Sequence, residues 1–213
     1  MIIGITSLKG GVGKSQISIN LAVYFAHEGY SVVIIDSDTN QTCGQFSGLR
    51  SDDLTDITVV GMQDPKQIRR NVKKLEEQFD VVLIDGVPAL SQMASTIILV
   101  SDLLLIPMIA SPADLWATEK FLERFDDAVT LKGERIPAYF VYNIHDDRLN
   151  ISKEVQEVVG EYDIQALKHS LRNRVAYRES IALGKGVMEY KDKKASQEFK
   201  ALGDEIHEIA KAI

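Results

Sequence analysis

The chain of 213 residues has little cysteine, little proline and no long apolar run. Its one cysteine, Cys43, cannot form an internal disulfide, and a chain of this length needs none to hold its core. No apolar stretch approaches the roughly 20 residues that span a bilayer, and Met1 leads straight into the apolar segment IIGIT without a basic leader. We therefore expect a cytoplasmic protein that is neither exported nor inserted in a membrane.

Positive charge is also scarce. The chain has 24 Lys and Arg against 31 Asp and Glu, a net charge of −7, which by itself argues against a nucleic-acid-binding protein. The segment from Lys168 to Lys194 is an exception, because its eight basic and three acidic residues give +5. Such a segment is either an anion-binding face or merely a solvated helix face.

Short apolar runs of strand length alternate with helical patterns along the chain. Runs of this kind are typical of parallel strands that are covered on both faces. The five runs are IIGIT, SVVIID, DVVLID, DLLLIP and AYFVYN. The alternation predicts an α/β fold, a doubly wound, mostly parallel sheet with helices on both faces, in one domain over residues 1–213.

Local signals place several helix ends. Ile17, Leu21 and Phe25 recur at helical spacing, and Gly29 follows where that helix should end. Asp64 and Ser111 each precede a proline, the pattern of an N-cap followed by proline at the first helical position.

A glycine-rich stretch, SLKGGVGKS at residues 7–15, follows the first predicted strand and precedes the first predicted helix. It nearly matches the phosphate-binding P-loop G-x-x-x-x-G-K-[ST], but Leu8 replaces the first glycine and Lys9 follows it. The glycines allow backbone N–H groups to face phosphate oxygens, and the helix adds its positive end. Lys14 should reach the β- and γ-phosphates, and Ser15 should bind Mg²⁺.

Carboxylates follow two of the predicted strands. Asp36 and Asp38 end SVVIIDSD, and Asp85 ends FDVVLID. Ligands of open α/β sheets lie at the carboxyl ends of strands, so these side chains should converge on the glycine-rich loop. Asp85, after four apolar residues, fits an aspartate that positions a metal ion.

Together these motifs resemble the ParA/MinD family of ATPases. KGGVGKS, with a lysine before the glycine pair, resembles the deviant Walker A motif of that family. IIDSD resembles its second-strand motif, and FDVVLIDGVPAL resembles its Walker B motif. RVAYRESIALGKGVMEY resembles the C-terminal part of ParA partition ATPases, so the likeness covers nearly the whole chain.

The resemblance implies an ATPase that uses ATP and Mg²⁺, with roles for individual residues. Lys9 would reach the phosphates of the partner in an ATP-bound dimer, and Asp38 would orient the attacking water. Ser15, Asp36 and Asp85 would serve the metal ion. The nucleotide-binding residues would be Lys9, Gly10, Gly11, Val12, Gly13, Lys14, Ser15, Gln16 and, as an adenine contact, Asn143.

The chain departs from the family pattern at a few positions. Thr39 and Asn40 follow Asp38 where the family has Pro-Gln, and Gly86 and Val87 stand between Asp85 and Pro88. Gln16 replaces a common threonine. The changes at residues 39–41 and 86–87 lie in segments that respond to nucleotide, so they bear on the hydrolysis rate and its coupling to partners and not on nucleotide binding.

Four branches of the family are candidates. An iron–sulfur protein is excluded because it needs cysteine pairs. A MinD-like protein would dock on membrane through its last helix, whose apolar stripe is Phe199, Leu202, Ile206, Ile209 and Ile213. The polar face of that helix is acidic, whereas interfacial helices favour Lys and Arg, so we expect the helix to pack on the core. A metabolic ligase or synthetase stays open.

A ParA-type positioning ATPase is the interpretation that we favour. Arg172, Arg174 and Lys185 lie where ParA-type proteins contact DNA phosphates, contacts that need charge and not base recognition. Because Met1 begins the first strand, we expect no preceding DNA-reading domain. The expected partners are a second copy of the chain, non-specific nucleoid DNA and a ParB-like or other adaptor that stimulates hydrolysis, whereas the sequence does not identify the cargo.

Overall fold

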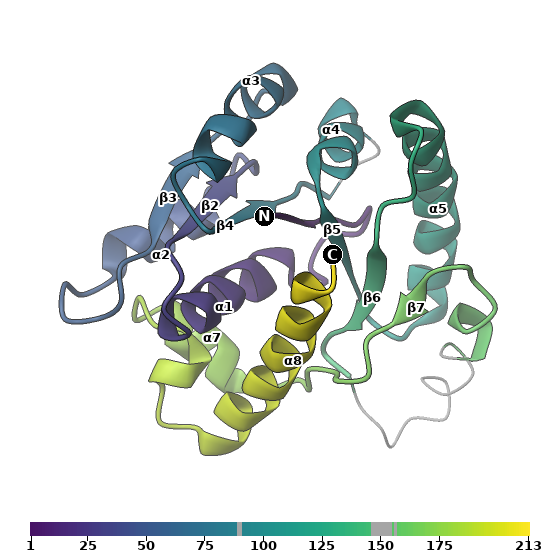
Figure 1. Cartoon of the computed structure of the whole chain (residues 1–213). Coiled ribbons are helices and arrows are strands. Elements are labelled where there is room, and N and C mark those ends of the chain that lie inside the picture. Colours follow the sequence, from purple (N-terminus) through teal and green to yellow (C-terminus); the bar gives the residue numbers. More distant parts are fainter. Residues whose placement is uncertain (89–90, 146–154, 156) are drawn as a thin grey trace.

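The computed structural model of the protein describes residues 1–88, 91–145, 155 and 157–213. For residues 112–114 it describes the backbone and not the side chains. Its centre is a parallel sheet of seven strands in the order β3-β2-β4-β1-β5-β6-β7 (Figure 1). The strands are β1 (Ile2–Ile5), β2 (Val32–Asp36), β3 (Thr58–Gly61), β4 (Val81–Asp85), β5 (Leu103–Met108), β6 (Ala138–Tyr142) and β7 (Gln165–Ala166).

Helices cover both faces of the sheet (Figure 1). One face carries α3 (Pro65–Glu76), α4 (Gln92–Val100) and α5 (Pro112–Lys132). The other carries α1 (Lys14–His27), α2 (Thr42–Leu49), α7 (Val175–Ile181), the short 3₁₀ helix η1 (Val187–Glu189) and α8 (Lys193–Lys211). Two apolar cores result, one between each helical layer and the sheet. The predicted doubly wound α/β fold is confirmed.

The five predicted strands are all present, and two further strands lie at the edges of the sheet. β3 is only half-buried, and β7 has two residues, so neither gives a long apolar run in the sequence. The predicted helix ends are also confirmed. Asp64 caps α3 by accepting a hydrogen bond from the Lys66 backbone N–H, and Gly29 follows α1 with a positive φ of 89°.

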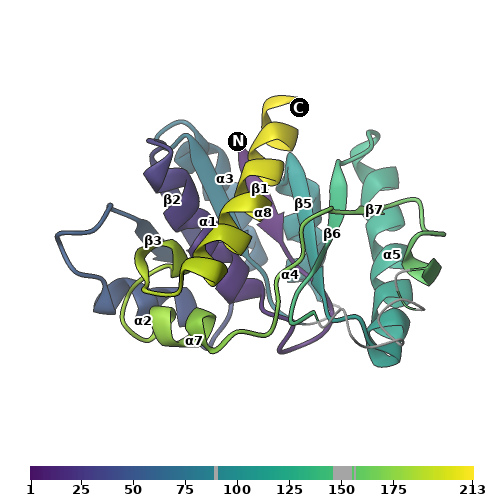
Figure 2. The same cartoon turned by 90° about the horizontal axis from the view of Figure 1, so that it is seen from below.

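The last helix, α8, crosses α1 and packs against it, as the two views of the molecule show (Figures 1 and 2). Phe199, Leu202 and Ile206 are fully buried in the core that also holds α1. The prediction that α8 packs on the core is therefore confirmed, except at Ile213. That residue lies beyond the end of the helix at Lys211 and is 54% exposed, so it does not continue the apolar stripe. No helix in the described ranges is long and apolar enough to cross a bilayer.

A buried ion pair joins α2 to the C-terminal region. The Arg50 guanidinium donates hydrogen bonds to both carboxylate oxygens of Glu189, at 2.7 and 2.9 Å, and to the Gly184 carbonyl. The two side chains are 7% and 4% exposed. Gly184, with a φ of 67°, packs so closely on the Leu49 backbone that a Cβ atom could not fit there. Arg50 therefore fixes the turn at residues 182–186 against the end of α2.

Replacing Glu189 by alanine should cost the folded state about 3 kcal/mol, because the buried Arg50 charge would lose its partner. Urea unfolding followed by circular dichroism measures this cost. Lys211→Ala is the matched control, since the pair between Lys211 and Glu208 is exposed and such pairs contribute little. Similar unfolding midpoints for the two variants would contradict a structural role of the buried pair.

Candidate functional site

The glycine-rich loop joins the end of β1 to the start of α1 at the carboxyl edge of the sheet. Gly11 and Gly13 have φ values of 76° and 91°, which residues with a side chain rarely adopt. Gly13 is the N-cap of α1, and its carbonyl accepts the first helical hydrogen bond from Ile17. Gly10 and Gly11 are exposed, so their backbone and the positive end of α1 face solvent, ready for an anion.

Asn143, just after β6, holds this loop in place through a hydrogen bond. Its side-chain amide donates a 2.8 Å hydrogen bond to the Val12 carbonyl, and the residue is 1% exposed. A Cβ atom on Gly13 would collide with the same amide nitrogen, so only glycine fits above Asn143. The contact with Val12 was not foreseen from the sequence, because 131 residues separate the two. The predicted adenine contact of Asn143 is not tested and stays a prediction.

Lys14, the first residue of α1, points back into the loop. Its ammonium group donates a 2.9 Å hydrogen bond to the carbonyl of Lys9, and the residue is 6% exposed. Burial lowers the pKa of Lys14, and the nearby carboxylates of Asp85 and Asp38 act in the opposite direction. A phosphate would supply the negative charge that this buried ammonium group attracts.

Asp36 and Asp85 lie directly opposite each other at the ends of neighbouring strands β2 and β4. They are 1% and 0% exposed. The Asp36 carboxylate accepts hydrogen bonds from the backbone N–H groups of Asp38, Cys43 and Gly44, the last two in the first turn of α2. The Asp85 carboxylate accepts hydrogen bonds from the Ser18 hydroxyl at 3.0 Å and from the side chain of Ser15.

Burial raises the pKa of both carboxyl groups. The pKa of Asp85 rises from 3.8 to about 6, chiefly through loss of solvent and with a contribution from the charge of Asp36. The hydrogen bonds from Ser15, Ser18 and Cys43 act against this rise. Burial likewise raises the pKa of the Cys43 thiol, which donates to Asp85 at 3.4 Å. The two carboxylates therefore form a strained acidic pair that a divalent cation would relieve.

Asp38 begins the turn between β2 and α2. Its carboxylate accepts a hydrogen bond from the Asn40 backbone N–H, and its carbonyl accepts one from Gln41. Gln41 has a positive φ of 51°, which is uncommon for a residue with a side chain. Thr39 and Asn40, two of the departures from the family pattern, thus form the tip of an exposed turn beside the predicted water-orienting aspartate.

The residues present fit a magnesium–nucleotide complex. Mg²⁺ is commonly held by one or two carboxylates together with substrate phosphates, and Ser15, Asp36 and Asp85 supply oxygen atoms of the required kind. No group of three or more His, Cys, Asp or Glu residues within the described ranges is arranged to hold a metal ion alone. Two buried polar atoms of the loop, Ser7 Oγ and Gln16 Nε2, have no hydrogen-bond partner in the described part of the chain, as expected of a site completed by a polar ligand.

Comparison with known proteins agrees with this geometry. The model of the CobQ/CobB/MinD/ParA nucleotide-binding domain matches residues 3–187. The chain belongs to this family. The ParA/MinD resemblance of the sequence motifs is therefore confirmed.

Relatives and solved structures of the ParA/MinD family cover nearly the whole chain. The maintenance of carboxysome distribution protein A of Halothiobacillus neapolitanus is 26% identical over 88% of this chain and 86% of its own. The chromosome partitioning protein ParA of Myxococcus xanthus is 24% identical, over 96% and 87%. The structure of McdA from Cyanothece superposes with a TM-score of 0.80 at 18% identity, over 96% and 98%. MinD of Pyrococcus horikoshii, solved with Mg-ADP, gives 0.76 at 22%, over 98% and 96%.

The residues that the ParA/MinD resemblance assigns to DNA lie in the C-terminal region, on the side of the sheet that α1 covers. Arg174, the N-cap of α7, forms an ion pair with Glu198 of α8 at 3.0 Å, and the Arg172 backbone N–H donates to the same carboxylate. Lys185 lies in the turn that Arg50 fixes. Segment 168–194 is thus not one helix. It comprises the loop after β7, helix α7, η1 and the first residues of α8. Its binding role stays a prediction.

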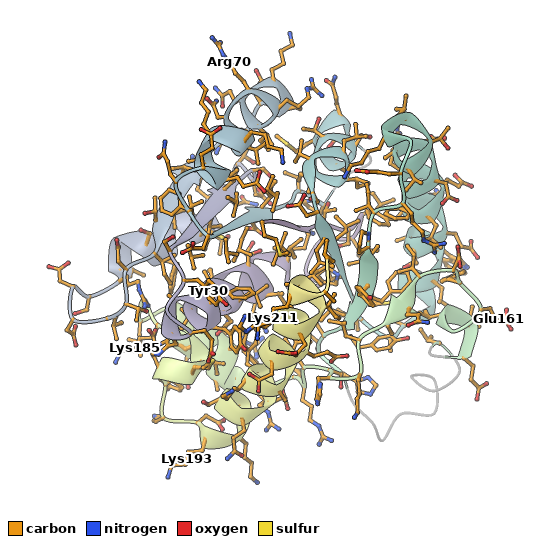
Figure 3. All side chains as sticks on the ribbon, in the orientation of Figure 1. Tyr30, Arg70, Glu161, Lys185, Lys193 and Lys211 are labelled. Atoms are coloured by element: carbon orange, nitrogen blue, oxygen red, sulfur yellow. The ribbon has the colours of Figure 1, made fainter. Side chains whose placement is uncertain are left out.

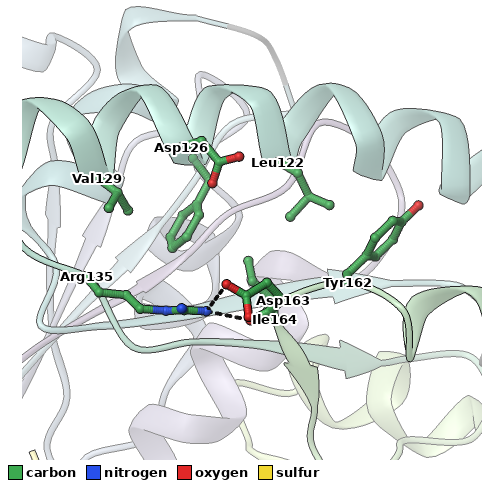
Figure 4. Close-up of a pocket in the computed structure, with 8 residues that line it drawn as sticks. Leu122, Asp126, Val129, Arg135, Tyr162, Asp163 and Ile164 are labelled. Atoms are coloured by element: carbon green, nitrogen blue, oxygen red, sulfur yellow. Dashed lines mark hydrogen bonds and ion pairs between the residues drawn. The ribbon is translucent and has the colours of Figure 1, made fainter.

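A hollow of about 260 Å³ lies beneath the C-terminal half of α5, at the end of the sheet opposite the phosphate loop (Figure 4). Leu122, Phe125 and Val129 form its apolar wall, and the pair between Arg135 and Asp163 closes its other side. Because these residues precede β6 and β7, the hollow is at the amino edge of the sheet. It contributes nothing to the nucleotide site of this family member.

Asp85→Asn should stabilise the nucleotide-free protein at pH 8. In the folded chain the carboxyl group holds its proton up to about pH 6, against 3.8 in the unfolded chain, so its contribution to stability falls as the pH rises from about 4 to 6. The variant should therefore gain about 3 kcal/mol over the wild type at pH 8 and little below pH 4. Urea unfolding at the two pH values measures this difference, and an equal gain at both would contradict the buried charge as its cause.

Proposed function

We propose that the chain is an ATPase that hydrolyses ATP with Mg²⁺ and uses the cycle to position or partition a cargo. The observation that supports the proposal is the convergence of the glycine-rich loop, Lys14 and the buried pair Asp36 and Asp85, together with a second lysine in the same loop. Lys14 already occupies the cis position, with its ammonium group against the loop, so that position does not account for the second lysine, Lys9. Relatives named for partition and for carboxysome distribution support the same class of work.

Each residue of the site then has a distinct task. The loop N–H groups and Lys14 bind and neutralise the phosphates, and Ser15, Asp36 and Asp85 hold Mg²⁺, which offsets charge on the phosphates when bound. Asp38 orients the water that attacks the terminal phosphorus, from a turn that α2 anchors to Asp36. Asn143 maintains the loop conformation through Val12. Gln16 borders the phosphates, and its side-chain amide is ready to donate a hydrogen bond.

Lys9 acts in trans, which makes two copies of the chain necessary for turnover. A cation delivered by a neighbouring subunit stabilises charge on the transferred phosphoryl group, as an arginine finger does. Lys9 and Leu8 border a small hollow with Ala117 and Thr118 of α5, which places α5 at the same edge as the loop. Trp116, which precedes Ala117 in α5, is 68% exposed and is the one tryptophan of the chain. A partner arriving at this edge would approach it.

The two lysines should separate binding from dimerisation. Lys14→Ala should weaken ATP binding about 100-fold, because it removes a charged donor to the phosphates. Lys9→Ala should keep ATP affinity within about threefold and lose the ATP-dependent dimer and turnover. Calorimetry gives the affinities, and light scattering gives the mass in an Asp38→Ala background that retains ATP. Trp116 fluorescence provides a second readout of association.

Two results would contradict the trans role. An Asp38→Ala protein that stays monomeric at saturating ATP and Mg²⁺ would remove the need for a partner. Equal loss of ATP affinity in both lysine variants would instead make Lys9 an ordinary ligand within its own loop.

The dimer binds duplex DNA without sequence preference through the C-terminal basic segment, and an adaptor protein stimulates hydrolysis. Lys185 is the best placed cation, since Arg50 fixes its turn, whereas a phosphate must compete with Glu198 for Arg174. Two copies double the number of phosphate contacts, so nucleotide controls binding by controlling association. Such a protein works in the cytoplasm on the nucleoid. The acidic outer face of α8 argues against the alternative of a membrane surface.

Lys185→Glu should abolish DNA binding at 150 mM salt while preserving the ATP-dependent dimer, since the change lies outside the phosphate site. Mobility shift of a fluorescent duplex with ATP, against ADP, measures the binding. Lys211→Glu, the same charge change at the far end of α8, is the control and should bind as the wild type does. A wild-type protein that ignores DNA but sediments with anionic vesicles would favour the membrane-associated alternative.

A further inference from the structure

A second basic surface lies on α3, outside the C-terminal segment. The segment 64–77 has five cations, Lys66, Arg69, Arg70, Lys73 and Lys74, and three acids, a net charge of +2 in a chain of −7. The helix buries Ile68 and Val72 on the sheet and exposes all five cations. Three of them, Lys66, Arg70 and Lys74, recur every fourth residue and so form one straight row along the outer face.

The cations of α3 differ in how they are paired. Lys73 forms an ion pair with Glu76 at 2.8 Å, and Arg69 donates a hydrogen bond to the Thr96 hydroxyl. The side chains of Lys66, Arg70 and Lys74 have no ion-pair or hydrogen-bond partner among the residues that the structure describes. In contrast, Arg174 in the C-terminal segment is already paired with Glu198. The row on α3 thus carries uncompensated positive charge.

The neighbours of the row indicate what it binds. Gln67 and Asn71, both amide donors, line with it a shallow hollow of about 480 Å³, whose one acidic residue, Asp64, caps the helix. The outer face of α3 has no exposed large apolar side chain. Protein interfaces and lipid-binding helices need such apolar anchors. Lys, Arg, Asn and Gln without apolar residues are instead the side chains that contact a phosphate backbone.

The spacing of the row suits a regular polyanion. Lys66 to Lys74 spans about 12 Å along the helix axis. Neighbouring cations are thus about 6 Å apart, nearly two of the 3.4 Å axial steps between phosphates of one DNA strand, so each of the three cations can meet a phosphate.

The row and the C-terminal segment lie on opposite sides of the molecule. In Figure 3 Arg70 projects from α3 on one side, and Lys185 and Lys193 lie on the other. The sheet separates them, because α3 packs in one core and α7 and α8 pack in the other. One duplex segment on the C-terminal face therefore leaves the α3 row available for another.

We propose that Lys66, Arg70 and Lys74 form a second DNA-backbone contact surface, which acts in every nucleotide state. The surface goes beyond the proposed function, since it belongs to a single subunit and needs neither ATP nor the dimer. Three phosphate contacts give a log–log salt slope of about −2.7, so affinity falls about 200-fold between 20 and 150 mM salt. The surface therefore binds DNA measurably at low salt and adds little to the ATP-controlled face at 150 mM.

Fluorescence anisotropy of a labelled duplex at 20 mM salt, with ADP, tests the proposal. The wild type should bind weakly, with a slope near −2.7, and the triple variant Lys66→Ala, Arg70→Ala, Lys74→Ala should lose this binding. Lys73→Ala on the same helix is the matched control, because its charge is already paired, and it should bind almost as the wild type does. Light scattering of the triple variant with ATP confirms that it folds and dimerises.

The outcomes separate this proposal from the proposed function. Loss of low-salt binding in the triple variant, with ATP-dependent binding at 150 mM intact, supports the α3 surface. A wild type without binding at 20 mM, or equal losses in the triple variant and Lys73→Ala, overturns it. Binding of anionic vesicles in place of DNA by the row on α3 would also overturn the proposal. Absence of an ATP-dependent increase at 150 mM, with low-salt binding intact, contradicts the proposed function alone.

Discussion

The rest of this site is arranged around two carboxylates that face each other in the protein interior. Asp36 and Asp85 end neighbouring parallel strands in exact register, and almost no solvent reaches either. Like charges in such surroundings destabilise the fold unless hydrogen-bond donors surround them. The chain provides those donors from the start of α1, through Ser15 and Ser18, and from the start of α2, through two backbone N–H groups. A bound cation would complete the compensation, so that the proposed metal site and the folded structure depend on the same two carboxylates.

The same compensation ties α2 to both functional regions. Its first turn donates to Asp36, and the residue after its end, Arg50, holds Glu189 and the turn that carries Lys185. α2 has eight residues, so Asp36, a candidate metal ligand, and the C-terminal basic turn are joined by one short element. The exposed turn at Thr39 and Asn40 connects Asp36 to α2 on this path. A change in the bound phosphates would therefore alter the conformation of this turn first.

Local patterns in the sequence were sufficient for the fold and for the phosphate loop. Fully buried parallel strands appear as unbroken apolar runs, and the glycine-lysine-serine motif is set by loop geometry within a few residues. Features that depend on distant pairs were not predictable in this way. Asn143 meets Val12, and Arg50 meets Glu189, only because the fold brings them together. The row on α3 was not predicted from the sequence, because its significance depends on burial and pairing, which show Arg174 compensated and Arg70 not.

The edges of the sheet limit how copies of this chain can meet. At one edge β7 has two residues, and at the other β3 has four and ends in Gly61. Short edge strands offer few unpaired backbone groups, so addition of a further strand from another molecule gains little. Self-association by sheet extension, the common route to uncontrolled aggregation, is therefore disfavoured. Contact between copies is then left to side chains, as in the proposed dimer at the carboxyl edge, which would form and dissociate with the nucleotide.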